Sequence, residues 1–331
     1  RPSKETLPGP FPRPFCLERR RLRKDGVRLV QKKSPCRHCE ATKWPKQSHT
    51  RDCFIASLLA MTTVMPARGG SASGGKNLLI TGGAGFIGSN LALEIERRFP
   101  EASVVVLDDF RSSSFKNLVG FKGEVLACDC AQKEWLEIFK DRSCDVIFHL
   151  ASITDTTLLD EKKMIFDNVE GFRNCLELAQ AKNSEVIYAS SAGVYGSGAV
   201  PGGAAGGGSQ DTPMKEEDAG KPNNVYGFSK WVMDQLAHGY EGKLKVVGLR
   251  YFNVFGPRES FKGAAASMIY QLAQQMLAGK RPRIFKWGGQ RRDFIYVKDA
   301  LDATLRAREA KRNTILNIGT GQATSFNEVI D

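Results

Sequence analysis

Residues 77–331 of this 331-residue sequence carry no net charge. The whole chain has 48 Lys and Arg against 36 Asp and Glu, a formal net charge of +12. Residues 1–76 hold 17 of the basic and 5 of the acidic residues, so the remaining 31 basic and 31 acidic residues balance. Because nucleic-acid binding depends on a basic surface, we expect no nucleic-acid partner for residues 77–331.

The first 75 residues lack the periodic apolar pattern of helices and strands. They are rich in Pro, Arg and Lys, which is typical of a disordered segment. The first methionine is Met61 and the next is Met65, which favours a true start at one of them. Residues 1–75 are therefore expected to be a disordered or artefactual leader.

Long hydrophobic runs are also absent. Residues 54–65 form an apolar run after basic residues, as in a signal-peptide core. A membrane span needs about 20 apolar residues, and export would separate the chain from a nucleotide cofactor. We therefore expect a cytoplasmic protein with no membrane contact.

Cysteines are few, and their spacing gives weak support for a metal. Cys36, Cys39, His49 and Cys53 have a spacing similar to that of zinc ligands, but coincidence in the leader is the favoured interpretation. The other cysteines are expected to be reduced, partly buried thiols, and no metal site is predicted. They are Cys128, Cys130, Cys144 and Cys175.

A strand, a glycine turn and a helix are predicted for residues 78–90, which read LLITGGAGFIGSN. Glycine permits a tight turn and lets the backbone approach a pyrophosphate, which the N–H groups at the helix start then hold. Asp108 ends the next predicted strand, where a ribose-binding acid belongs. This context predicts a dinucleotide site. Its loop contacts are Gly82, Gly85, Phe86, Ile87 and Gly88.

Short apolar runs alternate with helical patterns from residue 77 onward. This alternation predicts an α/β fold with a Rossmann-type, doubly wound parallel sheet. The predicted strands are residues 78–80, 103–107, 124–127, 145–150, 185–189 and 245–249. The predicted helices are residues 133–140, 162–181 and 229–238. We assign residues 76–250 to a cofactor-binding domain.

The pattern changes after Arg250. Helices are predicted over residues 263–279 and 299–310, and strands over residues 283–287, 293–297 and 314–318. Ser325 and Glu328 form a capping-box pattern for a last helix, in which the sequence ends. Residues 251–331 are therefore expected to form a smaller substrate domain that is truncated.

Tyr226 and Lys230 are four residues apart, so a helix there places both on one face. A lysine ammonium near a phenol lowers the pKa of the phenol and makes it usable as an acid/base. Ser191 follows the predicted strand 185–189 at the edge of the sheet where ligands bind, and its hydroxyl can hydrogen-bond a substrate oxygen. These three residues are predicted to be catalytic.

With this loop, this serine and this Tyr-x3-Lys pair, the sequence resembles the extended short-chain dehydrogenase/reductase family of NAD-dependent epimerases and dehydratases. It is similar in particular to the ADP-L-glycero-D-manno-heptose 6-epimerases. The similarity covers residues 77–331, and Lys262 is its more discriminating residue. It is carried by KPNNVYGFSK (221–230), RYFNVFGPRE (250–259), RRDFIYV (291–297) and NIGTG (317–321).

This resemblance implies epimerisation of ADP-glycero-manno-heptose, a lipopolysaccharide precursor, at C6″ by transient oxidation to a ketone. It implies that Tyr226 and Lys262 are acid/base groups on opposite faces of the sugar carbon, with Lys230 tuning Tyr226. The implied substrate contacts are Ser191, Asn253, Lys262, Phe285 and Arg292. The cofactor contacts, with those already named, are Asp108, Asp109, Arg111, Asp129, Leu150, Ala151, Ser152, Asn168, Tyr226 and Lys230. A homo-oligomer is expected.

Three departures from this family leave the exact sugar open. Ala264 stands where the family has a serine, and Gln271 stands where it has a histidine. Residues 285–289 (FKWGG) replace an FEGS-like substrate segment.

Two alternatives therefore stay open. One is another nucleotide-sugar 4-epimerase or 4,6-dehydratase, although residues 192–194 (AGV) stand where a dehydratase usually has an acidic pair. The other is a non-catalytic NAD(P)-binding protein, against which the intact Ser191, Tyr226 and Lys230 argue.

The identity of the cofactor is ambiguous. Asp108 and Asp109 would repel a 2′-phosphate and favour NAD. Arg111 and Lys116 could offset this by pairing with the phosphate. Since the resemblance favours NADP, NADP is the expected cofactor and NAD is the alternative.

Overall fold

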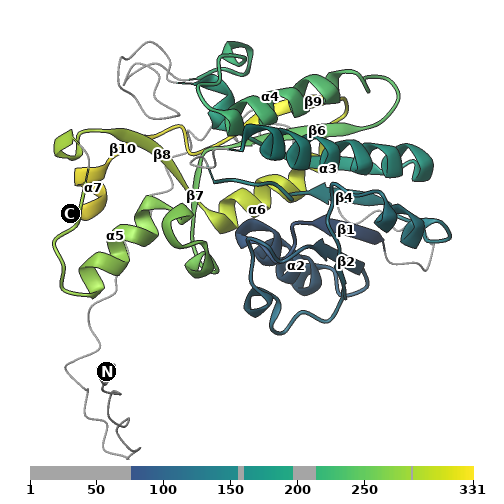
Figure 1. Ribbon diagram of the computed structural model, residues 1–331, viewed down its shortest axis with the longest axis horizontal. Helices are drawn as coiled ribbons and strands as arrows, with labels where there is room; N and C mark the ends of the chain where they lie inside the picture. Colours follow the sequence, from purple (N-terminus) through teal and green to yellow (C-terminus); the bar gives the residue numbers. More distant parts are fainter. Residues whose placement is uncertain (1–75, 156–159, 197–213, 285) are drawn as a thin grey trace, which may run out of the picture. The chain divides into compact units, whose positions relative to one another are not determined.

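The computed structural model describes residues 76–155, 160–196, 214–284 and 286–331. The predicted leader with its candidate zinc ligands lies outside this part of the chain, as does Phe285. Within it, a parallel sheet has the order β3-β2-β1-β4-β5-β6-β9, and the order reverses at β1 and β4. Figure 1 shows β2, β1, β4 and β6 of this sheet in that order. The predicted Rossmann-type sheet is confirmed. Its strands are β1 (Asn77–Thr81), β2 (Ser103–Asp108), β3 (Glu124–Ala127), β4 (Val146–His149), β5 (Glu185–Ser191), β6 (Val246–Tyr251) and β9 (Thr314–Ile318).

Helices cover both faces of this sheet. Helices α2 (Phe86–Arg98) and α6 (Val297–Arg306) pack on one face, and α3 (Glu161–Lys182) and α4 (Val225–His238) pack on the other. Two further helices are α5 (Met268–Leu277) and α7 (Phe326–Ile330). Among the described helices, none combines the length and the apolar character that crossing a bilayer requires.

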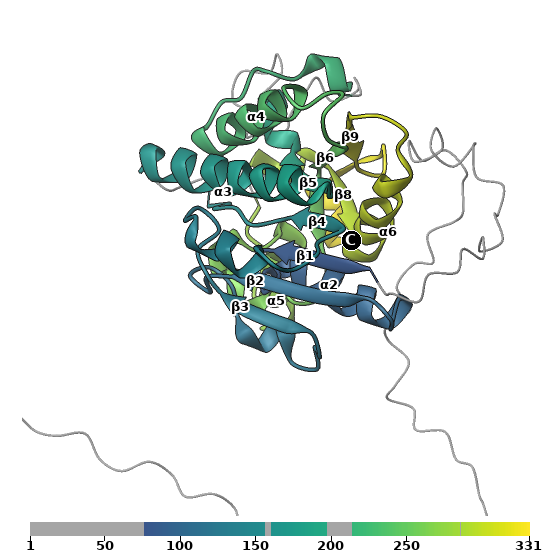
Figure 2. The same cartoon turned by 90° about the vertical axis from the view of Figure 1, so that its right-hand side faces the viewer.

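Successive residues of a buried strand point to opposite faces of the sheet. Leu78 and Ile80 of β1 belong to a core that includes residues of α2 and α6. Leu79 belongs to a second core, which includes residues of α3 and α4. Figure 2 shows α3 and α4 on one side of the strands and α6 on the other. The uninterrupted apolar strand patterns in the sequence therefore reflect burial on both faces.

Helix α4 begins four residues before the predicted helix 229–238. Its N-cap is Asn224, whose Oδ1 accepts a hydrogen bond from Gly227 N at 2.8 Å. An asparagine cap satisfies one of the N–H groups that a helix start leaves unpaired. Tyr226 therefore lies in the first turn of α4, and Lys230 lies one turn later.

Two predicted helices have a different form. Residues 133–140 contain a short 3-10 helix, Glu134–Phe139. The predicted helix 263–279 is divided into a 3-10 helix, Ser260–Ala265, and α5. The break lies at Ala266 and Ser267, whose ψ values of 158° and 149° are extended, and Ser267 then caps α5 by accepting from Tyr270 N at 3.1 Å.

The chain after β6 also forms a second sheet in the order β10-β8-β7. Its strands are β7 (Asn253–Phe255), β8 (Arg291–Tyr296) and β10 (Ala323–Ser325). The strand predicted over residues 283–287 is wrong. Residues Lys286–Gly288 form a 3-10 turn because Trp287 and Gly288 have positive φ values of 62° and 73°, which an extended strand does not allow. The capping box of α7 is confirmed.

A buried ion pair joins α4 to β6. Asp234 accepts from Arg250 Nε at 3.0 Å and from the Tyr188 hydroxyl at 2.8 Å. Arg250 also donates to the Tyr195 hydroxyl at 2.9 Å. The side chains of Arg250 and Asp234 are only 6% and 0% exposed. Each charge therefore depends on the other for its stabilisation.

Asp234→Ala should lower the free energy of unfolding by about 3–5 kcal/mol, because it leaves a buried guanidinium unpaired. Urea unfolding measures this change. Glu177→Ala is the matched control, since it breaks a pair with Lys133 whose side chains are 66% and 55% exposed and should cost about 1 kcal/mol or less. Equal losses in the two variants would contradict this account.

Candidate active site

The glycine turn brings the end of β1 against the segment that follows β4. Gly82 has a φ of 69°, and a Cβ atom there would lie 2.6 Å from Ala151 N. A Cβ atom on Gly88 would lie 2.2 Å from Gly82 O. No side chain fits at either position. Helix α2 starts at Phe86 without a side-chain cap, so its first N–H groups suit a phosphate. The predicted residues Gly85 and Ile87 lie in the same turn and at the same helix start.

The predicted cofactor residues 150–152 lie beside this turn, because the first of their N–H groups donates to Thr81 O at 3.0 Å. Asn168 of α3 is buried. Its Oδ1 accepts from Ile153 N at 2.7 Å, and its Nδ2 donates to Ser229 Oγ at 2.9 Å. Asn168 therefore fixes this segment against α4. The cofactor contact predicted for Asn168 stays a prediction.

Asp108 is buried at the end of β2 and holds the glycine turn. Its carboxylate accepts from Ala84 N at 2.9 Å and from Ser113 Oγ at 2.7 Å. The ribose contact predicted for Asp108 would use its remaining acceptor capacity.

Arg111 is surrounded by carboxylates. Its guanidinium lies 2.5 Å from Asp109, 3.3 Å from Asp129 and 3.1 Å from Asp167. These carboxylates, with the hydrogen bond from Asp109 as the largest contribution, raise the pKa of Arg111. The structure thus brings together the predicted cofactor contacts Asp109, Arg111 and Asp129. It adds Asp167, which lies far away in the sequence.

The three predicted catalytic residues meet at the carboxyl end of β5. Ser191 ends this strand, and its hydroxyl accepts from Gly193 N at 3.1 Å and acts on the Tyr226 phenol, whose pKa burial raises and this hydroxyl lowers. Lys230 is buried and donates from Nζ to Ser152 Oγ at 2.5 Å and to Ala189 O at 2.7 Å. Lys230 therefore links the segment after β4, strand β5 and helix α4.

The expected lowering of the Tyr226 pKa by Lys230 is wrong for this arrangement. Burial raises the pKa of Tyr226, and the hydrogen bond with Ser191 only opposes this effect. The Lys230 amine points to two oxygens and lies 5.9 Å from the centre of the tyrosine ring. Burial also lowers the pKa of Lys230 to about 7. Tyr226 is therefore a phenol at neutral pH and can donate a proton.

Lys262 lies in the loop before α5 and reaches the glycine turn. Its Nζ is 5.7 Å from the centre of the Phe86 ring, at the first residue of α2. Burial lowers the pKa of Lys262, and the charge of Glu259 opposes that effect. A lysine with a lowered pKa can serve as an acid/base near neutral pH.

Glu259 organises this loop, and sequence reasoning missed it. The buried carboxylate accepts from Gly256 N at 3.0 Å and from Ser267 N at 2.7 Å. Asn90 of α2 donates to Pro257 O at 2.9 Å and holds the loop against the cofactor side. In the sequence, Glu259 is visible only as an acidic residue inside the RYFNVFGPRE segment. Its burial becomes clear only in the folded structure.

Two predicted substrate residues lie on the second sheet. Asn253 of β7 donates from Nδ2 to Asp293 O at 3.1 Å. Arg292 of β8 donates to Arg291 O at 2.7 Å, and burial lowers its pKa. The paired strands β7 and β8 thus carry Asn253 and Arg292 together.

Residues 78–319 match the family described as NAD dependent epimerase/dehydratase. The chain belongs to the NAD-dependent epimerase/dehydratase family. The predicted family and the nicotinamide cofactor class are therefore confirmed, whereas the individual site residues stay predictions.

Solved structures are similar to this epimerase/dehydratase. ADP-L-glycero-D-manno-heptose-6-epimerase of Helicobacter pylori is 43% identical with a TM-score of 0.70, over 77% of this chain and 80% of that chain. UDP-glucose 4-epimerase of Thermotoga maritima, solved with UDP-glucose, is 29% identical with a TM-score of 0.69, over 77% and 80%. UDP-glucose 4-epimerase of Thermus thermophilus, solved with NAD, is 29% identical with a TM-score of 0.65, over 77% and 81%.

The buried Lys230 should make the stability of the cofactor-free epimerase/dehydratase depend on pH. Between pH 7 and 10.5 the unfolded chain holds a proton that folded Lys230 has lost, so stability should rise with pH by at most about 1.4 kcal/mol per unit. Lys230→Met should lack this rise, while Lys133→Met, which removes an exposed lysine, should keep it. If the wild-type protein and both variants showed the same dependence of unfolding free energy on pH, the lowered pKa of Lys230 would be refuted.

Proposed function

We propose that this protein epimerises a nucleotide-diphosphate sugar, namely ADP-glycero-manno-heptose at C6″. The proposal rests on two side chains that suit acid/base chemistry and come from different elements. Tyr226 comes from α4, and Lys262 comes from the loop before α5 and lies over Phe86. The 43% identity to a protein named as a heptose epimerase supports ADP-glycero-manno-heptose as the substrate.

Inversion through a ketone requires a proton acceptor for each configuration of the alcohol. A nicotinamide cofactor held at the glycine turn and residues 150–152 would supply the hydride chemistry for this oxidation and re-reduction. In one direction Lys262 accepts the hydroxyl proton and the Tyr226 phenol donates a proton to the re-reduced alcohol, and in the reverse direction the Tyr226 phenolate and the Lys262 ammonium exchange these roles. Ser191 hydrogen-bonds the same oxygen. Lys230 holds the segment after β4 through Ser152 and keeps Tyr226 in place.

The nucleotide-sugar would extend over the second sheet. The planar guanidinium of Arg292 suits a diphosphate, and Asn253 lies on the neighbouring strand. We therefore keep the division into a cofactor part, residues 76–250, and a nucleotide-sugar part, residues 251–331. We also propose that the protein acts in the cytoplasm as a homo-oligomer.

A 4-epimerase or a 4,6-dehydratase is the runner-up within the family. Residues Ala192–Tyr195 form a 3-10 turn directly after Ser191, and its sequence AGVY offers no acidic pair for a dehydration. The known 4-epimerases that are similar to this chain keep the first of these alternatives open.

The direct test is an incubation of the purified protein and its cofactor with ADP-glycero-manno-heptose, UDP-glucose and dTDP-glucose, with products read by NMR. Inversion at C6″ of the ADP-heptose alone supports the proposal. A C4 epimer of UDP-glucose would favour the runner-up. No product from any substrate, with cofactor bound, would favour a non-catalytic protein.

Lys262→Met should lower the rate of epimerisation by roughly 10²-fold or more, within the range of general acid/base effects. Tyr226→Phe should do the same, because each side chain serves one configuration. Both variants should bind cofactor with unchanged affinity, measured by fluorescence titration. Lys298→Met is the matched control, because Lys298 is exposed on α6, and it should keep the wild-type rate. If Lys262→Met epimerised the sugar at the wild-type rate, the proposal of ADP-heptose as the substrate would lose its main support.

Cofactor choice should depend on the carboxylates around Arg111. Since Asp109, Asp129 and Asp167 already occupy its guanidinium, we propose NAD as the preferred cofactor, in place of the NADP that the resemblance favours. Asp109→Asn should improve NADP binding by about tenfold relative to NAD, because it removes a negative charge and a competitor for Arg111. Calorimetry with both cofactors measures this ratio, and tighter binding of NADP by the wild-type protein would overturn the choice.

A further inference from the structure

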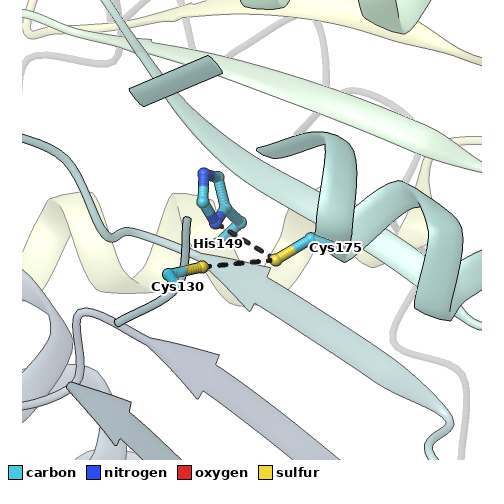
Figure 3. A group of neighbouring side chains, drawn as sticks. All are labelled: Cys130, His149 and Cys175. Atoms are coloured by element: carbon cyan, nitrogen blue, oxygen red, sulfur yellow. Dashed lines mark hydrogen bonds between the residues drawn. The ribbon is translucent and has the colours of Figure 1, made fainter. Parts of the chain in front are cut away.

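Three buried side chains converge beneath the cofactor segments without a role in the proposed reaction. Cys130 follows β3, His149 ends β4 and Cys175 lies on α3 (Figure 3). Cys130 Sγ lies 3.9 Å from Cys175 Sγ, which lies 3.3 Å from His149 Nδ1. All three donor atoms lie within 4.8 Å of one another.

Two of these distances are close to those between the ligands of a metal ion, and the third lies within 4.8 Å, so the cluster would contract slightly around a bound ion. Tetrahedral zinc with Zn–S bonds of about 2.3 Å and a Zn–N bond of about 2.0 Å separates its ligand atoms by roughly 3.5–3.8 Å. Two sulfurs and an imidazole nitrogen are soft donors that select zinc or copper(I) over harder ions. We propose that Cys130, His149 and Cys175 form a structural zinc site with Sγ, Nδ1 and Sγ as ligands.

Charge balance selects zinc within this group of metals. Two thiolates and a neutral imidazole exactly balance Zn²⁺, whereas they would leave a copper(I) complex with one negative charge. A net charge is costly in a site this deeply buried. His149 is neutral, since burial lowers its pKa to about 3. The Thr81 hydroxyl is hydrogen-bonded to His149 Nδ1 at 2.9 Å, a contact that zinc binding would replace.

The zinc would join three segments that hold the cofactor. Cys130 follows Asp129, His149 precedes residues 150–152, and Cys175 lies on the helix of Asn168. A metal at this point would fix the predicted cofactor contacts relative to each other. Burial raises the pKa of Cys175 well above its usual value, so zinc binding should release protons from the thiols.

The test is metal analysis of the full chain, purified without chelator from zinc-supplemented cells. Wild-type protein should carry about one zinc per chain, and Cys130→Ser and Cys175→Ser should each lose most of it. Cys144→Ser, which changes another buried cysteine, should retain the zinc. A double variant, Cys36→Ser with Cys39→Ser, should also retain it and so exclude the leader as the source.

A second measurement does not depend on the folding of variants. Wild-type protein loaded with cobalt(II) should show thiolate-to-cobalt charge-transfer absorption, and zinc should displace it and raise the thermal midpoint. The absence of zinc and of this absorption would overturn the proposal. So would zinc that persists in both cysteine variants of the cluster, zinc lost only with Cys36 and Cys39, copper in place of zinc, or a Cys130–Cys175 disulfide found by mass spectrometry.

Discussion

The missing side chain at Gly82 permits the contact on which the rest of the site depends. The ends of β1 and β4 lie next to each other in the sheet, and a Cβ atom at Gly82 would overlap the backbone at Ala151. Any larger residue would push apart the segments that form the crevice at the reversal of strand order. The helix start at Phe86 and the segment 150–152 lie at this approach, and Lys262 lies over the Phe86 ring.

Buried polar groups then fix what the glycine turn brings together. Lys230 and Asn168 bond to the segment after β4 from two different helices. Both side chains are almost inaccessible to solvent, so each lost bond would leave an unsatisfied polar group, which is costly. Because buried polar groups need partners from other segments, the site is held together by side chains spread between residues 81 and 267.

Much of the fold could be predicted because strand and helix periodicities differ and because glycine has a specific backbone role. The parallel strands and the shared helix face of Tyr226 and Lys230 follow from local pattern, whereas the start of that helix at Val225 depends on the Asn224 cap, which was not predicted. The small strands β7 and β10 could not be predicted, since three residues show no periodicity. The carboxylate of Glu259 and the high pKa of Tyr226 depend on burial, which arises only when distant segments pack.

The central claim is that two acid/base groups approach one sugar carbon from different sides. A crystal structure of the protein with nicotinamide cofactor and an unreactive ADP-sugar tests it most directly. The account predicts that the Tyr226 hydroxyl and the Lys262 amine both lie within hydrogen-bond distance of the positions available to the sugar hydroxyl, on opposite faces of the carbon. A complex in which Lys262 stays in contact with Phe86 and away from the sugar, while Tyr226 alone reaches it, would contradict the account.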